Sequence, residues 1–187
     1  MIKKIFEIKE INSNQEKIYL FYGVNEGLKT EKINHLLSNI NKELIFTYEE
    51  KDVLKNLDNF VEKILSKSLF ESNKYILIKR ATDKIIHAIN EISEKEIDNV
   101  KIIINAGVLE KKSKLRSLFE KSKNLISVAF YPDNFQTLSQ YAKNYLGEKK
   151  ISISPLQLNY IIDKCNNDRG LLLNELQKIL CYCRNGK

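Results

Sequence analysis

Tryptophan is absent from this chain of 187 residues, which has only two prolines, three cysteines and two histidines. Cys181 and Cys183 are one residue apart on an apparent helix, so they point different ways and suit neither a disulfide nor a C-x-x-C metal site. His35 and His87 lie on helical patterns far from any cysteine. We therefore expect no metal site and no cofactor, and we expect the cysteines to be buried or half-buried free thiols.

Long hydrophobic runs are also missing. No apolar run approaches the length of a membrane span, and residues 1–7 lack the apolar region of a signal peptide. These absences predict a cytoplasmic protein without a membrane partner. The 43% apolar and 29% charged residues are typical of a soluble globular chain, long enough for one domain and a small second one.

The first 130 residues alternate between apolar runs and helical patterns. We expect strands over 18–22, 44–48, 75–78, 100–104 and 125–130, with four helices between them. Asp52 is the expected N-cap of the helix that follows the second strand. Short connections and strands that are apolar on successive residues predict an α/β fold with a doubly wound, mainly parallel five-stranded sheet. Residues 1–17 are expected to form a short edge element.

Only helical periodicity follows residues 131–134. Helices are expected over 135–146, 155–165 and 171–183, with Ser154 capping the second of them and Pro155 in its first turn. We therefore predict an α/β domain over residues 1–132 and a small all-helical domain over 133–187. The ending Arg184–Lys187 resembles a turn out of a helix, so we expect the second domain to be truncated.

A glycine turn lies between the first long strand and the first helix, where a phosphate-binding loop would be. Gly23, Gly27, Lys29 and Thr30 resemble the pattern G-x-x-x-x-G-K-[ST], but one residue between the glycines is missing and Leu28 displaces the lysine. Glu26 would place a negative charge beside a bound phosphate. We interpret the turn as a degenerate phosphate loop; an ordinary strand-to-helix turn and a working ATP site are the alternatives.

Other parts of an ATPase are also missing or altered. The third strand runs into Lys79-Arg80-Ala81, where an acidic pair would be needed to hold Mg²⁺. Asp83 comes too late, and Asn105 is the single candidate for a polar γ-phosphate sensor. Because no Ser/His/Asp or Cys/His arrangement is evident either, we predict that the chain is not an enzyme.

The formal net charge is +7, and the densest basic cluster consists of Lys111, Lys112, Lys114 and Arg116. Such a cluster permits contact with DNA, although the same residues can simply solvate a helix face.

Leu69 and Phe70 stand out because two adjacent large apolar residues cannot both point inward from a regular element. An exposed Leu-Phe pair is typical of a hot spot that docks into a partner's apolar pocket. The alternative is a chain reversal that packs against its own core.

Four stretches of the chain, in this order, resemble the delta subunit of the bacterial DNA polymerase III clamp loader. The first is the strand and glycine over 19–23, and the second is Ser68–Ser72 with the strand Tyr75–Lys79. The others are the lysine-rich stretch over 109–115 and the late helix over 167–178, with its Asn-Glu-Leu-Gln-Lys sequence. The resemblance covers the whole chain.

The resemblance implies an AAA+ fold whose delta member does not hydrolyse ATP, and a helical lid as the second domain. It also implies that Leu69 and Phe70 insert into the hydrophobic pocket of the sliding clamp (the beta subunit) and that docking favours the open ring. ATP binding by neighbouring clamp-loader subunits would expose or hide this element. We therefore expect a clamp opener of the DNA polymerase III holoenzyme that contacts DNA indirectly or weakly.

The departure from the family is at the carboxy-terminal side. The resemblance implies that members of the family continue into the rest of the lid and a helical collar that assembles the loader, and we expect this chain to lack both. We expect this chain alone not to build the full complex. The rival hypotheses are an active AAA+ ATPase and a DNA-binding domain that uses the basic cluster.

Overall fold

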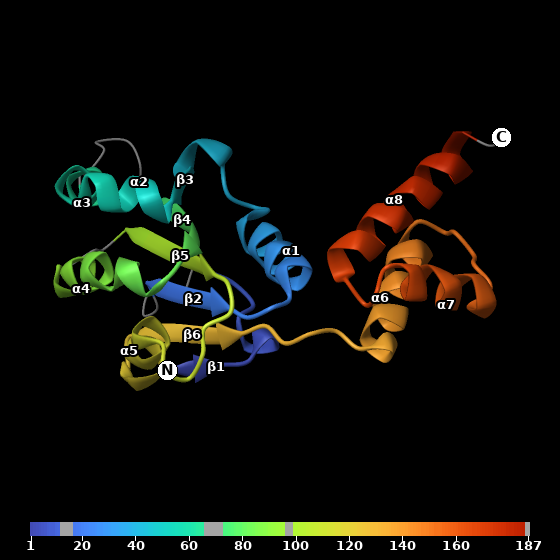
Figure 1. Ribbon diagram of the computed structural model, residues 1–187. Coiled ribbons are helices and arrows are strands. Elements are labelled where there is room, and N and C mark those ends of the chain that lie inside the picture. Colours follow the sequence, from blue (N-terminus) through green and yellow to red (C-terminus); the bar gives the residue numbers. More distant parts are fainter. Residues whose placement is uncertain (12–16, 66–72, 96–98, 186–187) are drawn as a thin grey trace. The chain divides into compact units, whose positions relative to one another are not determined.

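The computed structural model describes residues 1–11, 17–65, 73–95 and 99–185. The chain divides into two compact units. The sheet unit consists of residues 1–24 and 32–130, and the helical unit consists of residues 25–31 and 131–187. Figure 1 shows the elements of both units.

The sheet unit is built on six parallel strands in the order β1-β6-β2-β5-β4-β3. The five predicted strands are all present, and the parallel α/β class is confirmed. The sixth strand, β1, has two residues and pairs with β6 at the edge of the sheet. The strands are β1 (Ile2–Lys3), β2 (Ile18–Tyr22), β3 (Ile45–Glu49), β4 (Lys74–Ala81), β5 (Val100–Ala106) and β6 (Leu125–Ala129).

Helices cover both faces of this sheet, which explains why its strands are apolar on successive residues. On one side, α3, α4 and α5 pack side chains such as Phe60, Ile89 and Phe119 against alternate residues of β2 and β5 (Figure 1). Residues 32–37 of α1 lie on the other side. The helices of this part of the chain are α1 (Glu26–Leu37), α2 (Glu50–Lys55), α3 (Leu57–Leu65), α4 (Ile86–Glu94) and α5 (Lys114–Lys121), with the 3-10 turns η1 (Ile5–Glu7), η2 (Lys42–Leu44) and η3 (Asp83–Ile85).

The helix after β3 differs from its prediction. It begins at Glu50, so that Asp52 lies inside α2 and does not cap it. The chain leaves the helical conformation at Asn56, whose side chain then accepts a hydrogen bond of 3.1 Å from the backbone N–H of Asn59 and caps α3. The apolar pattern continues across both helices, which is why the sequence indicated one.

The helical unit contains α6 (Phe135–Glu148), α7 (Pro155–Lys164) and α8 (Arg169–Asn185), so all three predicted helices are present. Each of the first two begins with a capping box, formed by Asn134 with Thr137 and by Ser154 with Gln157. The core of this unit consists of the buried residues Leu138, Ala142, Leu146, Leu158, Ile162, Cys165, Leu172 and Leu176.

The cysteines are free thiols, but only Cys165 is buried. Cys181 and Cys183 are exposed on α8, which corrects the prediction that they are buried or half-buried. Across the described ranges, no group of three or more His, Cys, Asp or Glu residues could hold a metal ion. No helix among these residues is both long enough and apolar enough to span a membrane.

Candidate functional site

The turn after β2 is held by Gly23, which has a φ of +128°. Its N–H donates a 2.9 Å hydrogen bond to the carbonyl oxygen of Gly107, just beyond β5. A Cβ at Gly23 would lie 2.2 Å from the carbonyl oxygen of Phe130, so no larger residue fits without movement of the backbone. This glycine is therefore required by backbone conformation and close packing within the sheet unit, independently of any ligand.

Asn25 begins the part of the site that belongs to the helical unit. Its Oδ1 accepts a 3.0 Å hydrogen bond from the N–H of Leu28, so it caps α1. Its Nδ2 donates to Asp133 Oδ2 at 2.7 Å and to the carbonyl oxygen of Tyr131 at 3.0 Å. The sequence signal for this cap is an asparagine directly before a helical pattern.

Lys29, the lysine of the candidate phosphate loop, is buried. Its Nζ lies 2.5 Å from Glu26 Oε1, and its side chain has no exposed surface. Thr30 is exposed on the next position of the helix. Gly27 serves close packing, because a Cβ there would lie 2.8 Å from the backbone nitrogen of Gly170 at the start of α8. The lysine that would have to reach a phosphate is thus paired with a carboxylate of the protein.

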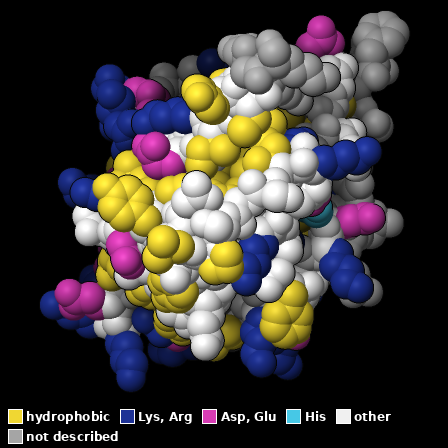
Figure 2. All heavy atoms as spheres, turned by 90° about the vertical axis from the view of Figure 1, so that its right-hand side faces the viewer, with side chains coloured by type: hydrophobic (Ala, Val, Ile, Leu, Met, Phe, Trp, Pro, Cys, Tyr) yellow, Lys and Arg dark blue, Asp and Glu magenta, His cyan; other side chains and the backbone are white. Residues whose placement is uncertain are grey.

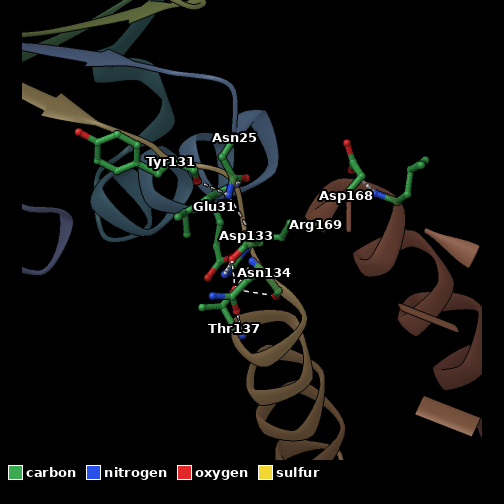
Figure 3. A network of polar contacts seen from close by, with 10 residues as sticks. Asn25, Glu31, Tyr131, Asp133, Asn134, Thr137, Asp168 and Arg169 are labelled. Atoms are coloured by element: carbon green, nitrogen blue, oxygen red, sulfur yellow. Dashed lines mark hydrogen bonds and ion pairs between the residues drawn. The ribbon is translucent and has the colours of Figure 1, made fainter. Parts of the chain in front are cut away.

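Arg169 lies at the centre of a polar network on which three segments converge (Figure 3). Its Nε and Nη2 donate to the two carboxylate oxygens of Asp133 at 2.8 and 2.9 Å, and its Nη1 donates to Glu31 Oε2 at 2.9 Å. The guanidinium carbon lies 4.4 Å from the ring centre of Tyr141. Only 10% of the Arg169 side chain and 4% of the Asp133 side chain are exposed.

The network also fixes the charges of its members. Burial alone would raise the pKa of Asp133, but hydrogen bonds from Arg169, Asn25 and Thr137 outweigh burial and hold that pKa below its usual value. Burial opposes the charge of Arg169, and the hydrogen bonds to Asp133 and Glu31 raise its pKa nonetheless. Burial, followed by the charge of Glu31, raises the pKa of Tyr141 to about 12. Asp133 and Arg169 are therefore charged at neutral pH.

Asp83 has a capping role in place of a metal-binding one. Its carboxylate accepts hydrogen bonds from Ser113 Oγ at 2.6 Å and from the N–H groups of Leu115 and Lys114 at 3.0 and 3.1 Å. These bonds, that of Ser113 first, lower the pKa of Asp83. The carboxylate thus stabilises the start of α5. Asn105, the other candidate, lies near the end of β5, and its buried Oδ1 has no hydrogen-bond partner in the described part of the protein.

The four residues of the basic cluster have different environments. Lys111, Lys112 and Lys114 are exposed, and Lys112 is 3.0 Å from Glu110. Arg116 has contacts within the sheet unit: its Nε donates to Glu120 Oε1 at 2.8 Å, its Nη1 donates to a backbone carbonyl, and its guanidinium lies 5.1 Å from the ring centre of Tyr22. The structure thus leaves three lysines facing solvent and gives the arginine a packing role.

Leu69 and Phe70 lie outside the described residues, between the end of α3 and the start of β4.

An apolar groove of about 840 Å³ runs along α7 in the helical unit. Apolar side chains gather on this side of the molecule in Figure 2. Leu156 and Tyr160 line the groove and are 80% and 63% exposed. Sequence reasoning missed the groove, because the helical pattern of α7 placed these residues on an ordinary amphipathic helix. The other apolar residues that line it include Ile151, Ile153, Ile161 and Ile179.

Comparison with protein-family models and with curated proteins gave no match. Solved structures do match. The Bacillus subtilis DNA clamp loader delta protein YqeN is 12% identical with a TM-score of 0.63 over 96% of this chain. Domain III of the Thermotoga maritima replication initiation protein DnaA is 15% identical with a TM-score of 0.55 over 98% of this chain and 83% of its own. A point variant of Thermotoga maritima RuvB is 14% identical with a TM-score of 0.53, over 86% of this chain and 53% of its own.

These similarities establish an AAA+-like fold, and they confirm the resemblance to the clamp loader delta protein at the level of the fold. The chain spans 57% of the length of the Bacillus subtilis protein. The neighbours include proteins of DNA replication.

Proposed function

We propose that this chain is a non-catalytic clamp-loader subunit that binds and opens the DNA sliding clamp during DNA replication. The observation that carries the proposal is the similarity of fold to a clamp loader delta protein over 96% of the chain. Its expected partners are the sliding clamp (the beta subunit) and other clamp-loader subunits, and its contact with DNA is indirect or weak.

The non-catalytic part of the proposal is supported by the three positions where an ATPase would need free groups. Lys29 is paired with Glu26, and the carboxylate of Asp83 accepts hydrogen bonds at the start of α5. Arg80, at the end of β4, is exposed where an acidic pair would hold Mg²⁺.

Leu69 and Phe70 are the proposed contact with the clamp, on the strength of the resemblance. Opening a ring in this way requires differential binding, because a ligand shifts an equilibrium only by the difference in its affinity for the two states. The protein must therefore bind the open ring more tightly than the closed ring. An apolar anchor that fits a pocket of the open form would supply such a difference.

The test is binding of this chain to the cognate sliding clamp, measured by calorimetry. The double variant Leu69→Ala/Phe70→Ala is expected to lose about 2 kcal/mol or more, roughly 30-fold in Kd, as truncation of a hot spot typically does. The matched control is Leu156→Ala/Tyr160→Ala, which removes another apolar pair from the exposed groove of α7. If wild type and the Leu69→Ala/Phe70→Ala variant bind the clamp with equal affinity, the contact with the clamp is made by other residues.

A second candidate function, direct contact with DNA, is favoured by the exposure of Lys111, Lys112 and Lys114. Lysines on a surface bind phosphates without sequence preference, and the affinity falls steeply with salt. Direct contact with DNA is compatible with the role of a clamp-loader subunit, because a sliding clamp is loaded onto DNA.

A further inference from the structure

The carboxylate of Asp133 accepts the set of hydrogen bonds that a bound phosphate would accept. Arg169 approaches it with two parallel N–H groups at 2.8 and 2.9 Å, a geometry that matches carboxylates and phosphates alike. Asn25 Nδ2 and Thr137 Oγ1 add donors at 2.7 and 2.8 Å. Because its side chain is only 4% exposed, Asp133 is an anion enclosed by protein donors.

This anion lies beside the start of α1. Asn25, which holds Asp133 with its amide nitrogen, caps that helix with its amide oxygen. The beginning of a helix after a glycine turn is where phosphate groups bind in nucleotide-binding α/β proteins. All of these residues belong to the helical unit, as do the first turns of α1.

Two further carboxylates balance the remaining cations of this region. Glu26 pairs with Lys29 at 2.5 Å, and Glu31 pairs with Arg169 at 2.9 Å. Lys29 and Arg169 are thus paired with three carboxylates of the protein. A phosphate that entered would have to displace a buried carboxylate held by a bidentate arginine, and it would add negative charge where three carboxylates already surround two cations.

We propose that Arg169, Asn25 and Thr137 form a self-occupied anion site beside the start of α1, in which Asp133, assisted by Glu26 and Glu31, takes the place of a phosphate and excludes nucleotides. The inference rests on the proposed function only in its expectation that ATP is not bound. The proposal attributes the expected absence of nucleotide binding to the protein's own carboxylates as well as to the altered spacing of the glycines. Removing the internal anion should therefore create an anion site.

The test compares the full chain with the variant Asp133→Asn, which keeps the shape of the side chain and removes its charge. Inorganic pyrophosphate and magnesium-ATP are the probes, titrated by calorimetry and by shift of Tm at constant ionic strength with sodium chloride. Wild type is expected to bind neither probe at millimolar concentration. The variant Asp133→Asn is expected to bind pyrophosphate at least ten-fold more tightly than wild type, and the added substitution Arg169→Gln should abolish this gain.

The charge control is Glu175→Gln, which removes an exposed carboxylate of α8 that pairs with Lys178. It should remain unable to bind pyrophosphate. Binding by wild type overturns the proposal whatever the variants do, as does a folded Asp133→Asn protein that binds no pyrophosphate. If Asp133→Asn does not fold, the variant Glu31→Gln tests the proposal. This variant keeps the bidentate pair between Arg169 and Asp133 and removes the carboxylate that binds Arg169 Nη1. It must bind pyrophosphate more tightly than wild type, or the proposal is wrong. Clamp binding is measured separately, so either proposal can fail alone.

Discussion

The guanidinium of Arg169 meets the carboxylate of Asp133 through two parallel hydrogen bonds, although 36 residues separate them in the chain. Because both side chains are nearly enclosed, removal of one partner leaves the other charge buried. Asp133→Ala is expected to lower the free energy of unfolding by about 3 kcal/mol, the lower end for a buried pair because Glu31 still binds Arg169. Urea denaturation of the chain measures this loss.

The matched control for that prediction is Glu175→Ala, which breaks an exposed pair with Lys178 on α8. Exposed pairs contribute between about 0 and 1 kcal/mol, so this variant should unfold close to wild type. Comparable losses in the two variants would show that the network of Arg169 adds little stability.

Stability is expected to fall in acid because the pKa values of both Asp83 and Asp133 are lowered in the folded protein. The unfolded chain, with Asp pKa values of about 3.9, binds more protons than the folded chain between those values and the lowered ones. The stabilisation is therefore complete above the unfolded pKa and is lost as the pH falls through the folded pKa values. Urea midpoints at pH 6, 4 and 3 measure the effect, and Asp133→Asn should show a smaller decline than wild type.

Gly23 is expected to tolerate no side chain. In Gly23→Ala the Cβ would meet the carbonyl oxygen of Phe130, and alanine would have to adopt a φ of +128°. A loss of about 2 kcal/mol or more follows from the strain and the clash. Gly147→Ala is the opposite case, because a Cβ on this helical residue would meet no heavy atom within 4 Å apart from its chain neighbours and the backbone of its own helix. Thermal unfolding should show it to be more stable by about 0.5 kcal/mol.

The residues of the basic cluster are expected to differ in role: Arg116 stabilises the fold, and the exposed lysines are available for contact with DNA. Arg116→Ala should lower the free energy of unfolding by about 1 to 2 kcal/mol, because it removes contacts with Glu120, a backbone carbonyl and the ring of Tyr22. Lys111→Ala/Lys112→Ala should change stability by less than about 0.5 kcal/mol. If these lysines contact DNA, the double variant lowers the slope of log affinity against log salt by about two. Fluorescence anisotropy between low and moderate salt measures that slope, and an unchanged slope would remove the two lysines from any DNA interface.

The sequence predicted those parts of the fold that depend on local pattern. Four of the five predicted strands were evident because they are buried on both faces, and β3, which is only partly buried, because it is rich in residues that favour strands. The helices α6 and α7 were evident because their caps precede an apolar periodicity. The strand β1 was not evident, since two residues carry no periodicity. The break at Asn56 was hidden because the apolar stripe continues across it.

The polar network shows what local pattern cannot predict. Arg169 joins residues 36 and 138 positions away, and no sequence spacing signals such a contact. Sequence reasoning recognised that Glu26 would oppose a phosphate, but it could not place Asp133 at the start of α1. The role of Asp83 also depended on which helix starts the fold brings together, and that of Arg116 on the packing of α5 beside Tyr22 of β2.

The order of the strands has a consequence for synthesis of the chain on the ribosome. Ile18 of β2 pairs with Ile102 of β5 and with Leu125 of β6, so the partners of this strand are made 84 (102 minus 18) and 107 (125 minus 18) residues later. A nascent chain therefore carries β2 with both edges unpaired until most of the sheet unit has been translated. Unpaired apolar edges favour aggregation, and distant pairings are slow to form. Aggregation of the nascent chain is thus most favoured before β5 and β6 emerge to pair with β2.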